Sequence, residues 1–327
     1  RPEKNHWLVV SRPLEEALAT ALWRGERAIL FLNQRGFAPA WHCPACGGSA
    51  KCPRCSVALT FHRWRKKAMC HACLAEMPPP TQCGECKGPL TMVGVGTERA
   101  EDTLKHMFPA ARIARMDRDT MVRREDYEEL YRSFAAGEHD ILLGTQMVAK
   151  GLDFPDVTVV GVLNADTALH HPDFRSSERC FDLIAQVAGR AGRSAKGGRV
   201  VVQTWLPDHP AIRAAVKHDF RGFAARELEE RSAFGYPPCG RTVRITCEGA
   251  RADRADRLAE DAAELLRATA RGVRGIEILG PAPHAIERLR GRWRRQVLVK
   301  APLGDPFALQ AALEDLCQRE HVTVDPL

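Results

Sequence analysis

Eight of the twelve cysteines fall within residues 43–86, where they form four Cys-x-x-Cys pairs. Each pair can present two thiolates on a tight turn, and Zn²⁺ prefers four such ligands in a tetrahedron. A secreted disulfide scaffold is the competing explanation, but the other four cysteines are scattered and the first residues lack the apolar core of an export signal. The pattern therefore predicts two zinc ions with four cysteine ligands each. The pairs are Cys43 with Cys46, Cys52 with Cys55, Cys70 with Cys73, and Cys83 with Cys86.

The spacing of the pairs does not by itself decide which of them share an ion. Five residues separate Cys46 from Cys52, so a site shared by the first two pairs would be cramped. A nested hairpin avoids the crowding, with the two middle pairs around an inner ion and the first and last pairs around an outer one. Because four protein thiolates leave no coordination position for water, both ions are expected to be structural and not catalytic.

A basic stretch, residues 63–67, lies between the second and third pairs and places one tryptophan among four cations. Positive charge and aromatic stacking are the means by which proteins bind single-stranded nucleic acid. Arg63 and Arg65 are therefore candidate DNA contacts. A solvated hairpin tip without a ligand is an equally good explanation.

Composition sets further limits on the kind of protein. The 327 residues are 45% hydrophobic and 27% charged, which is typical of a globular protein of two or three domains. No apolar run approaches the roughly 20 residues of a membrane-spanning helix, so we expect no membrane partner and a cytoplasmic location. The net charge of +7 permits a polyanionic partner without requiring one. The missing initiator methionine suggests that the chain begins inside a longer protein.

Strand and helix patterns alternate on both sides of the cysteine block. Buried strands typically read as short apolar runs, and helices repeat their apolar residues every three or four positions. The alternation predicts a mostly parallel sheet with helices on both faces, an α/β fold. The expected strands are 28–32, 112–116, 141–143, 157–162 and 199–203, and the expected helices are 11–24, 98–107, 124–135 and 178–190.

After a break at residues 235–238, the pattern changes to that of a small α+β domain. Strands are expected at 241–247, 276–279 and 293–300, with helices at 252–270 and 307–319. A basic cluster surrounds Trp293 in this region. On a strand, Arg292 and Arg294 would share one face and Arg295 the other. This cluster predicts a surface for DNA or for an acidic protein tail, and a solvated strand edge is the alternative.

Residues 140–153 carry the first of two motifs with chemical meaning. An apolar strand runs into Gly144-Thr145, and a Gly-x-Asp sequence that ends at Asp153 follows. Such a turn can offer backbone N–H groups and a hydroxyl to phosphate oxygens. An ordinary strand and turn explains the motif equally well.

The second motif, residues 186–193, reads Gln-Val-Ala-Gly-Arg-Ala-Gly-Arg. Arg190 and Arg193 lie three residues apart, so they share one face of a helix. Paired guanidinium groups suit the γ-phosphate of a nucleotide, as in an arginine finger. The alternative is a basic helix end that only offsets the helix dipole.

These two motifs resemble motifs V and VI of superfamily 2 helicases. The run Leu30 to Pro39, followed directly by the cysteine block, is similar to one family in particular, the bacterial primosomal replication restart helicases. The resemblance spans essentially the whole chain. It implies a RecA-like second helicase lobe at 1–41 and 88–218, a two-zinc insertion at 42–87, a linker at 219–240 and a C-terminal α+β domain at 241–327.

The family also implies an activity, which is ATP-dependent 3′→5′ unwinding at stalled forks and assembly of the primosome. By the resemblance, Thr145 would contact the DNA backbone. Gly151, Asp153 and Gln186 would contact the nucleotide, and Arg190 and Arg193 would reach its γ-phosphate. The implied partners are forked and single-stranded DNA, the tail of single-strand DNA-binding protein and other primosome proteins.

The sequence contains no Gly-x-x-x-x-Gly-Lys-[Ser/Thr] motif and no Asp-Glu-x-His box. In the family these belong to a first motor lobe that precedes this segment, so ATP and Mg²⁺ are expected to bind only with that lobe. We therefore expect the segment alone to be inactive. Two other hypotheses compete with a helicase fragment. One is an ATPase-inactive restart factor that binds DNA and recruits proteins, and the other is a zinc-ribbon protein of transcription or RNA metabolism, which would not need the paired arginines.

Overall fold

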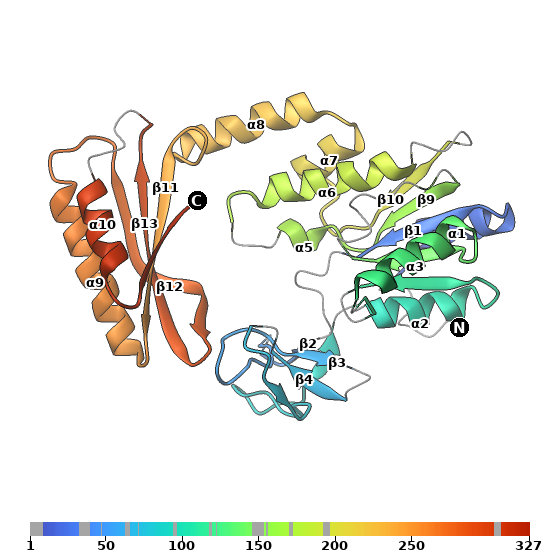
Figure 1. The fold of residues 1–327 in the computed structure, drawn as a ribbon, viewed down its shortest axis with the longest axis horizontal. Helices are drawn as coiled ribbons and strands as arrows, with labels where there is room; N and C mark the ends of the chain where they lie inside the picture. Colours follow the sequence, from blue (N-terminus) through green and yellow to red (C-terminus); the bar gives the residue numbers. More distant parts are fainter. Residues whose placement is uncertain are drawn as a thin grey trace. The chain divides into compact units, whose positions relative to one another are not determined.

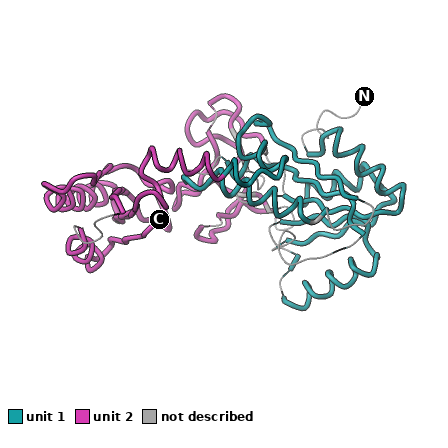
Figure 2. Tube along the Cα trace, turned by 90° about the horizontal axis from the view of Figure 1, so that it is seen from above, with its two compact units in different colours: residues 1–39, 94–223 teal, residues 40–93, 224–327 magenta. Residues whose placement is uncertain are grey.

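The computed structural model describes the chain except for residues 1–8, 33–39, 47, 63–65, 71, 94–96, 118–119, 122, 146–153, 155, 170–172, 192–196 and 304–308. The chain divides into two compact units (Figure 2). The first unit contains residues 1–39 and 94–223, and the second contains residues 40–93 and 224–327. Among the described helices, none combines the length and apolar character needed to cross a membrane.

The first unit is built on a five-stranded sheet in which every pair of neighbouring strands is parallel. The strand order is β10 (Arg199–Val202), β9 (Val157–Val162), β1 (Arg27–Phe31), β8 (Ile141–Gly144) and β7 (Ile113–Met116). The chain therefore passes from β8 on one side of β1 to β9 on the other. All carboxyl ends lie along one edge, the place where open parallel sheets bind ligands.

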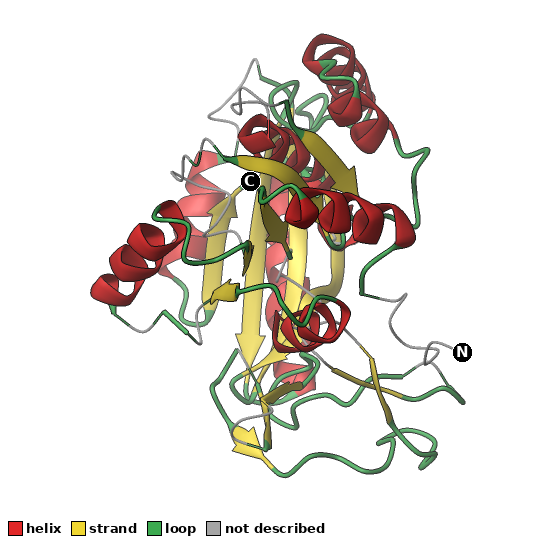
Figure 3. Cartoon of the chain, turned by 90° about the vertical axis from the view of Figure 1, so that its right-hand side faces the viewer, coloured by secondary structure: helices red, strands yellow, loops and turns green. Residues whose placement is uncertain are grey.

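Helices cover both faces of this sheet, and alternate residues of β1 explain why (Figures 1 and 3). Ala28 and Leu30 pack with α1 (Arg12–Trp23) and α2 (Thr97–Met107) in one buried cluster. Ile29 and Phe31 belong to the opposite cluster, because successive side chains of a strand point to opposite faces. That second cluster includes residues of α3 (Arg124–Ala135), α6 (Ser176–Ala191) and α7 (Pro210–Val216). The predicted parallel sheet with helices on both faces is confirmed.

The second unit begins with the cysteine region, which forms a small antiparallel sheet. Its strands are β2 (Ala40–His42), β3 (Thr60–His62), β4 (Lys67–Met69), β5 (Glu76–Met77) and β6 (Thr91–Val93), in the order β5-β4-β3-β2-β6. Its buried cluster joins Trp41, Leu59 and Ala68 to cysteines of the inner pairs. Strands this short bury little area, so the cysteines make up much of the core.

The remainder of the second unit is a four-stranded antiparallel sheet with two helices. The strand order is β12 (Glu277–Leu289), β13 (Arg292–Ala301), β11 (Arg241–Gly249) and β14 (Val322–Pro326), and the helices are α9 (Ala252–Thr269) and α10 (Gln310–Gln318). Alanines of α9 and apolar residues of β11 and β13 form one buried cluster. The α+β prediction is confirmed, although β12 is much longer than the predicted 276–279.

Several described elements were missed by the sequence prediction. The segment expected as a linker contains a 14-residue helix, α8 (Phe220–Ala233). Its apolar residues follow no clear helical face, so the periodicity that reveals an amphipathic helix is weak. Strands β2 to β6 of the cysteine region were also not predicted, and neither were α5 (Asp166–Leu169), α7 and the last strand, β14.

Candidate functional site

The four cysteine pairs are closed by one repeated backbone hydrogen bond. In each pair the amide of the first cysteine donates to the carbonyl five residues later, with N···O distances between 2.7 and 2.9 Å. Two of the resulting loops need a left-handed residue directly after the second cysteine, Leu74 and Lys87, each with φ of 61°. The donor and acceptor residues are Cys43 and Gly48, Cys52 and Val57, Cys70 and Ala75, and Cys83 and Gly88.

The thiols gather in two groups of four, and within each group every Sγ lies within 4.8 Å of the others. A tetrahedral site with Zn–S bonds of about 2.3 Å has S···S edges of about 3.8 Å. The S···S distances Cys43–Cys86, Cys46–Cys83 and Cys52–Cys73 are 3.4, 3.6 and 3.8 Å. Both groups therefore fit zinc. The outer group is Cys43, Cys46, Cys83 and Cys86, and the inner group is Cys52, Cys55, Cys70 and Cys73, which is the nested arrangement favoured by the sequence.

Backbone amides prepare some of these thiols for metal binding. The Cys46 amide is the strongest of several donors that lower the pKa of the Cys43 thiol to about 7. In the inner group, the Ala75 amide has the main part in lowering the pKa of Cys73 to about 7. Since zinc binds the thiolate, donors that favour the deprotonated sulfur also favour the metal-bound state.

Thr145, the predicted DNA contact, lies directly after β8 at the carboxyl edge of the parallel sheet. Only 4% of the residue is exposed. Its amide donates to the carbonyl of Met116, the last residue of the neighbouring strand β7, at 3.3 Å. The main chain at this position is therefore held by the sheet, and the contact of Thr145 with DNA stays a prediction.

The predicted nucleotide-binding residues are described only in part. Gln186 is exposed on α6, the helix that packs against β9 on one face of the sheet. Arg190 lies in the last turns of the same helix, but its side chain is outside the described part of the chain. Gly151, Asp153 and Arg193 fall outside the described residues altogether, and so do Arg63 and Arg65 of the cysteine region.

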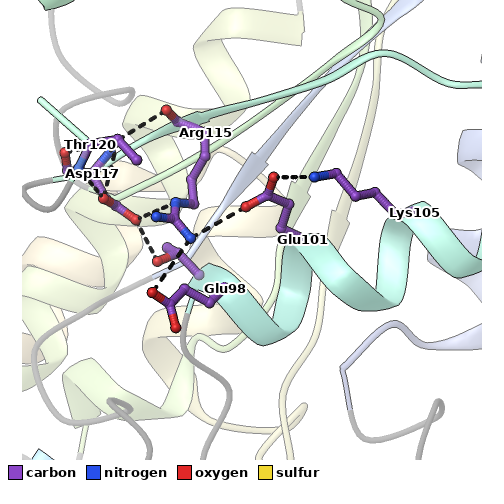
Figure 4. A network of polar contacts seen from close by, with 7 residues as sticks. Glu98, Glu101, Lys105, Arg115, Asp117 and Thr120 are labelled. Atoms are coloured by element: carbon purple, nitrogen blue, oxygen red, sulfur yellow. Dashed lines mark hydrogen bonds and ion pairs between the residues drawn. The ribbon is translucent and has the colours of Figure 1, made fainter. Parts of the chain in front are cut away.

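A buried carboxylate at the same edge was missed by the sequence prediction. Asp117 directly follows β7 and its side chain is fully buried. It accepts a hydrogen bond from the Thr97 hydroxyl at 2.5 Å and one from the Thr120 amide at 3.0 Å. Arg115 joins this carboxylate to Glu101 of α2, with N···O distances of 3.1 and 3.3 Å (Figure 4). The signal in the sequence was an acidic residue directly after a predicted strand.

The basic cluster around Trp293 is paired with acidic residues of its own domain. Arg292 and Arg294 both reach Glu248 of β11, with N···O distances of 3.5 and 3.1 Å, which confirms that they share a face. Arg295 pairs with Asp256 of α9 and with Glu287. The side chains of Arg294 and Arg295 are only 15% and 12% exposed. These cations support the domain, and their predicted role in binding DNA or an acidic tail is untested.

Three family models match separate regions of the chain. The helicase conserved C-terminal domain matches residues 87–195. The Cys-rich region domain of the PriA DNA helicase matches residues 52–78. The primosomal protein N C-terminal domain matches residues 232–327. The parallel-sheet lobe, the cysteine region and the C-terminal domain thus each match a helicase or primosomal family.

Curated relatives cover all of these regions in one alignment. The replication restart protein PriA of Bacillus subtilis is 43% identical over 288 residues, which are 88% of this chain and 36% of that protein. The chain belongs to the PriA family.

Other members of the PriA family align in the same way. The Haemophilus influenzae protein is 39% identical over 95% of this chain and 42% of its own length. The Thermotoga maritima protein is 34% identical over 87% of this chain and 38% of its own length. The chain therefore spans about two fifths of the length of these relatives.

Proposed function

We propose that this chain is the C-terminal part of an ATP-dependent 3′→5′ DNA helicase that recognises stalled replication forks and restarts replication through primosome assembly. The observation that carries the proposal is the alignment with PriA proteins through the parallel-sheet lobe, the cysteine region and the C-terminal domain together. A zinc-ribbon protein of transcription would need only the middle of these regions.

Within this proposal, the chain supplies one side of a nucleotide site. Arg190 of α6 and Arg193, which follows that helix in the sequence, would reach the γ-phosphate of ATP, whose Mg²⁺ complex a preceding motor lobe would hold. Gly151, Asp153 and Gln186 would complete the nucleotide contacts. Thr145, at the carboxyl end of β8, would contact the DNA backbone.

The test uses the full-length protein on forked DNA. Arginine fingers contribute a factor of about 10³ or more to turnover, so Arg190→Ala and Arg193→Ala should each lower ATP hydrolysis by about that factor while fork binding is kept. Arg124→Ala is the matched control, because Arg124 is an exposed arginine of the same lobe that pairs with Glu128. Undiminished hydrolysis in both arginine variants would refute the nucleotide assignment.

The isolated 327-residue chain should behave differently from the full-length protein. Because its sequence carries no phosphate-binding Gly-Lys-[Ser/Thr] loop, we expect no ATP hydrolysis above background with forked DNA. Robust turnover by this chain alone would contradict the division of the site between two lobes.

The alternative function is an ATPase-inactive restart factor that binds DNA and recruits proteins. It predicts that full-length Arg190→Ala and Arg193→Ala proteins still restart replication on forks. Under either function the proposed partners are forked and single-stranded DNA, the tail of single-strand DNA-binding protein and other primosome proteins in the cytoplasm. Arg63, Arg65, Arg292, Arg294 and Arg295 are the candidate contacts, and substitutions of the last three need a folding control because of their ion pairs.

A further inference from the structure

The hairpin that joins β12 to β13 ends in a tight two-residue turn. Arg290 and Gly291 form its two-residue loop with φ of 50° and 88°. Two residues with positive φ are typical of the tight turns whose twist matches that of the flanking strands. The turn at Arg290 and Gly291 therefore fixes the backbone direction of the tip.

This tip lies on the inner cysteine group of the same compact unit. Arg288 and Ser56 bind each other at two points, because the Ser56 amide donates to the Arg288 carbonyl at 2.8 Å and the Arg288 amide donates to the Ser56 hydroxyl at 2.7 Å. The Gly291 amide donates to the Arg54 carbonyl at 2.7 Å. Backbone groups make most of these bonds, so the fit depends on the shape of the loop that carries Cys52 and Cys55.

Two further contacts reach the metal-binding group itself. The Arg290 amide donates to the Sγ of Cys55 at 3.1 Å. Leu289 packs against the buried cluster that contains Cys52, Cys55 and Cys70. Cys55 is fully buried, so an amide from a distant part of the sequence supplies a hydrogen bond that water does not. Hydrogen bonds of this kind around a metal ligand hold and tune the site.

We propose that the inner zinc site is the docking socket of the C-terminal domain, and that residues 288–291 are the part that docks. Zinc on Cys52, Cys55, Cys70 and Cys73 gives the loop at 53–56 the shape that the hairpin tip recognises. The hydrogen bonds named above all reach residues 54–56, which lie in the loop closed by the Cys52 amide and the Val57 carbonyl. The two zinc ions therefore have different tasks, since the outer ion closes the base of the cysteine region and the inner ion attaches the C-terminal domain.

Hydrogen exchange of the full chain tests the proposal, with zinc content measured in parallel. Cys70→Ser removes an inner ligand, and amides of residues 290 and 291 should exchange about tenfold faster or more. Cys83→Ser is the matched control because it removes an outer ligand, and the inner group is nested within the outer one. In that control the same amides should keep their protection. Equal loss of protection in both variants, with the inner ion retained in Cys83→Ser, would overturn the proposal.

A variant of the hairpin avoids any damage to the zinc ligands. Leu289→Asp places a charge against the buried cluster, so it should free the tip while two zinc ions per chain are retained. When NMR-active cadmium replaces zinc, the inner resonance should shift in Leu289→Asp and the outer resonance should not. Protection at residues 290 and 291 that survives in Leu289→Asp, or an unshifted inner resonance, would show that the hairpin does not depend on this socket.

Discussion

The parallel-sheet lobe and the cysteine region are stabilised by different means. The lobe buries large side chains such as Phe31, Phe134 and Leu104 on the two faces of its sheet. The cysteine region has strands of two or three residues, and three of the seven buried residues described in its cluster are cysteines. Apolar burial is enough for the first region, whereas metal coordination has to supply the stability of the second.

Removal of zinc should separate the two regions most clearly. Structural zinc in small modules contributes roughly 10–16 kcal/mol of apparent binding free energy, which is also folding free energy. A strong chelator should therefore unfold residues 40–93 and leave the parallel sheet of the lobe intact. Metal content, expected to be close to two zinc per chain before treatment, and region-resolved hydrogen exchange would measure this. Loss of protection in β1 and β8 at the same chelator concentration would contradict it.

Truncation of the lobe's core should have the opposite effect. Phe134 is fully buried and packs edge-to-face on Phe154 with ring centroids 4.7 Å apart. Phe134→Ala should lower the free energy of unfolding of the lobe by about 3–5 kcal/mol, with zinc content unchanged. Trp23→Ala is the control, because Trp23 is 86% exposed. Denaturant unfolding followed by hydrogen exchange would reveal whether the damage stays within the lobe.

The polar network at the edge of the sheet should make a smaller contribution. Asp117→Asn keeps the size of the side chain but removes its negative charge. That charge pairs with Arg115 and strengthens the hydrogen bond from the Thr97 hydroxyl. We expect the free energy of unfolding of the lobe to fall by about 2 kcal/mol, because the hydrogen bonds to the charged Asp117 are buried. The loss is not larger because Arg115 keeps its ion pairs with Glu98 and Glu101. Lys105→Ala breaks only an exposed pair with Glu101 and should cost less than about 1 kcal/mol. Equal effects in the two variants would remove the special role of Asp117.

Acidification should weaken the two units in different pH ranges. Burial lowers the pKa of His284 to about 4, helped by the charges of Arg294 and Arg244. The unfolded histidine binds a proton near pH 6.5, so the C-terminal domain loses stability as the pH falls from about 6.5 to 4. Burial alone would raise the pKa of Asp173 in the lobe, but hydrogen bonds from Arg175 prevail and lower it to about 2.

The contribution of Asp173 is present above the unfolded pKa of about 3.9 and is lost as the pH falls toward 2. Each group should change the stability of its own unit by at most about 2 kcal/mol, after allowance for its partial exposure. His284→Gln should remove the loss between pH 6.5 and 4 in the C-terminal domain and leave the acid response of the lobe unchanged. A single transition shared by both units at every pH would contradict this assignment.

Local patterns in the sequence predicted much of the fold and of the zinc sites. The five strands of the lobe lie within a residue or two of their predicted ranges, because buried parallel strands leave a distinct apolar run. The eight zinc ligands follow from their spacing, and the crowding between Cys46 and Cys52 favoured the nested grouping that the structure shows. Helix α8 was missed because it lacks the periodicity of a half-buried element. Strand β14 was missed although Val322 and Val324 alternate with polar residues and pack against the core, as in a half-buried strand.

The sequence by itself therefore determined the zinc ligands and the parallel sheet, since both depend on spacing between near neighbours in the chain. Only the tertiary structure decided what the basic residues of the C-terminal domain contact. Arg294 and Arg295 face Glu248 and Asp256, and Arg288 meets Ser56 across 232 positions of sequence. Such contacts arise when separate elements pack together, and the residue types alone do not specify which distant partner each will meet.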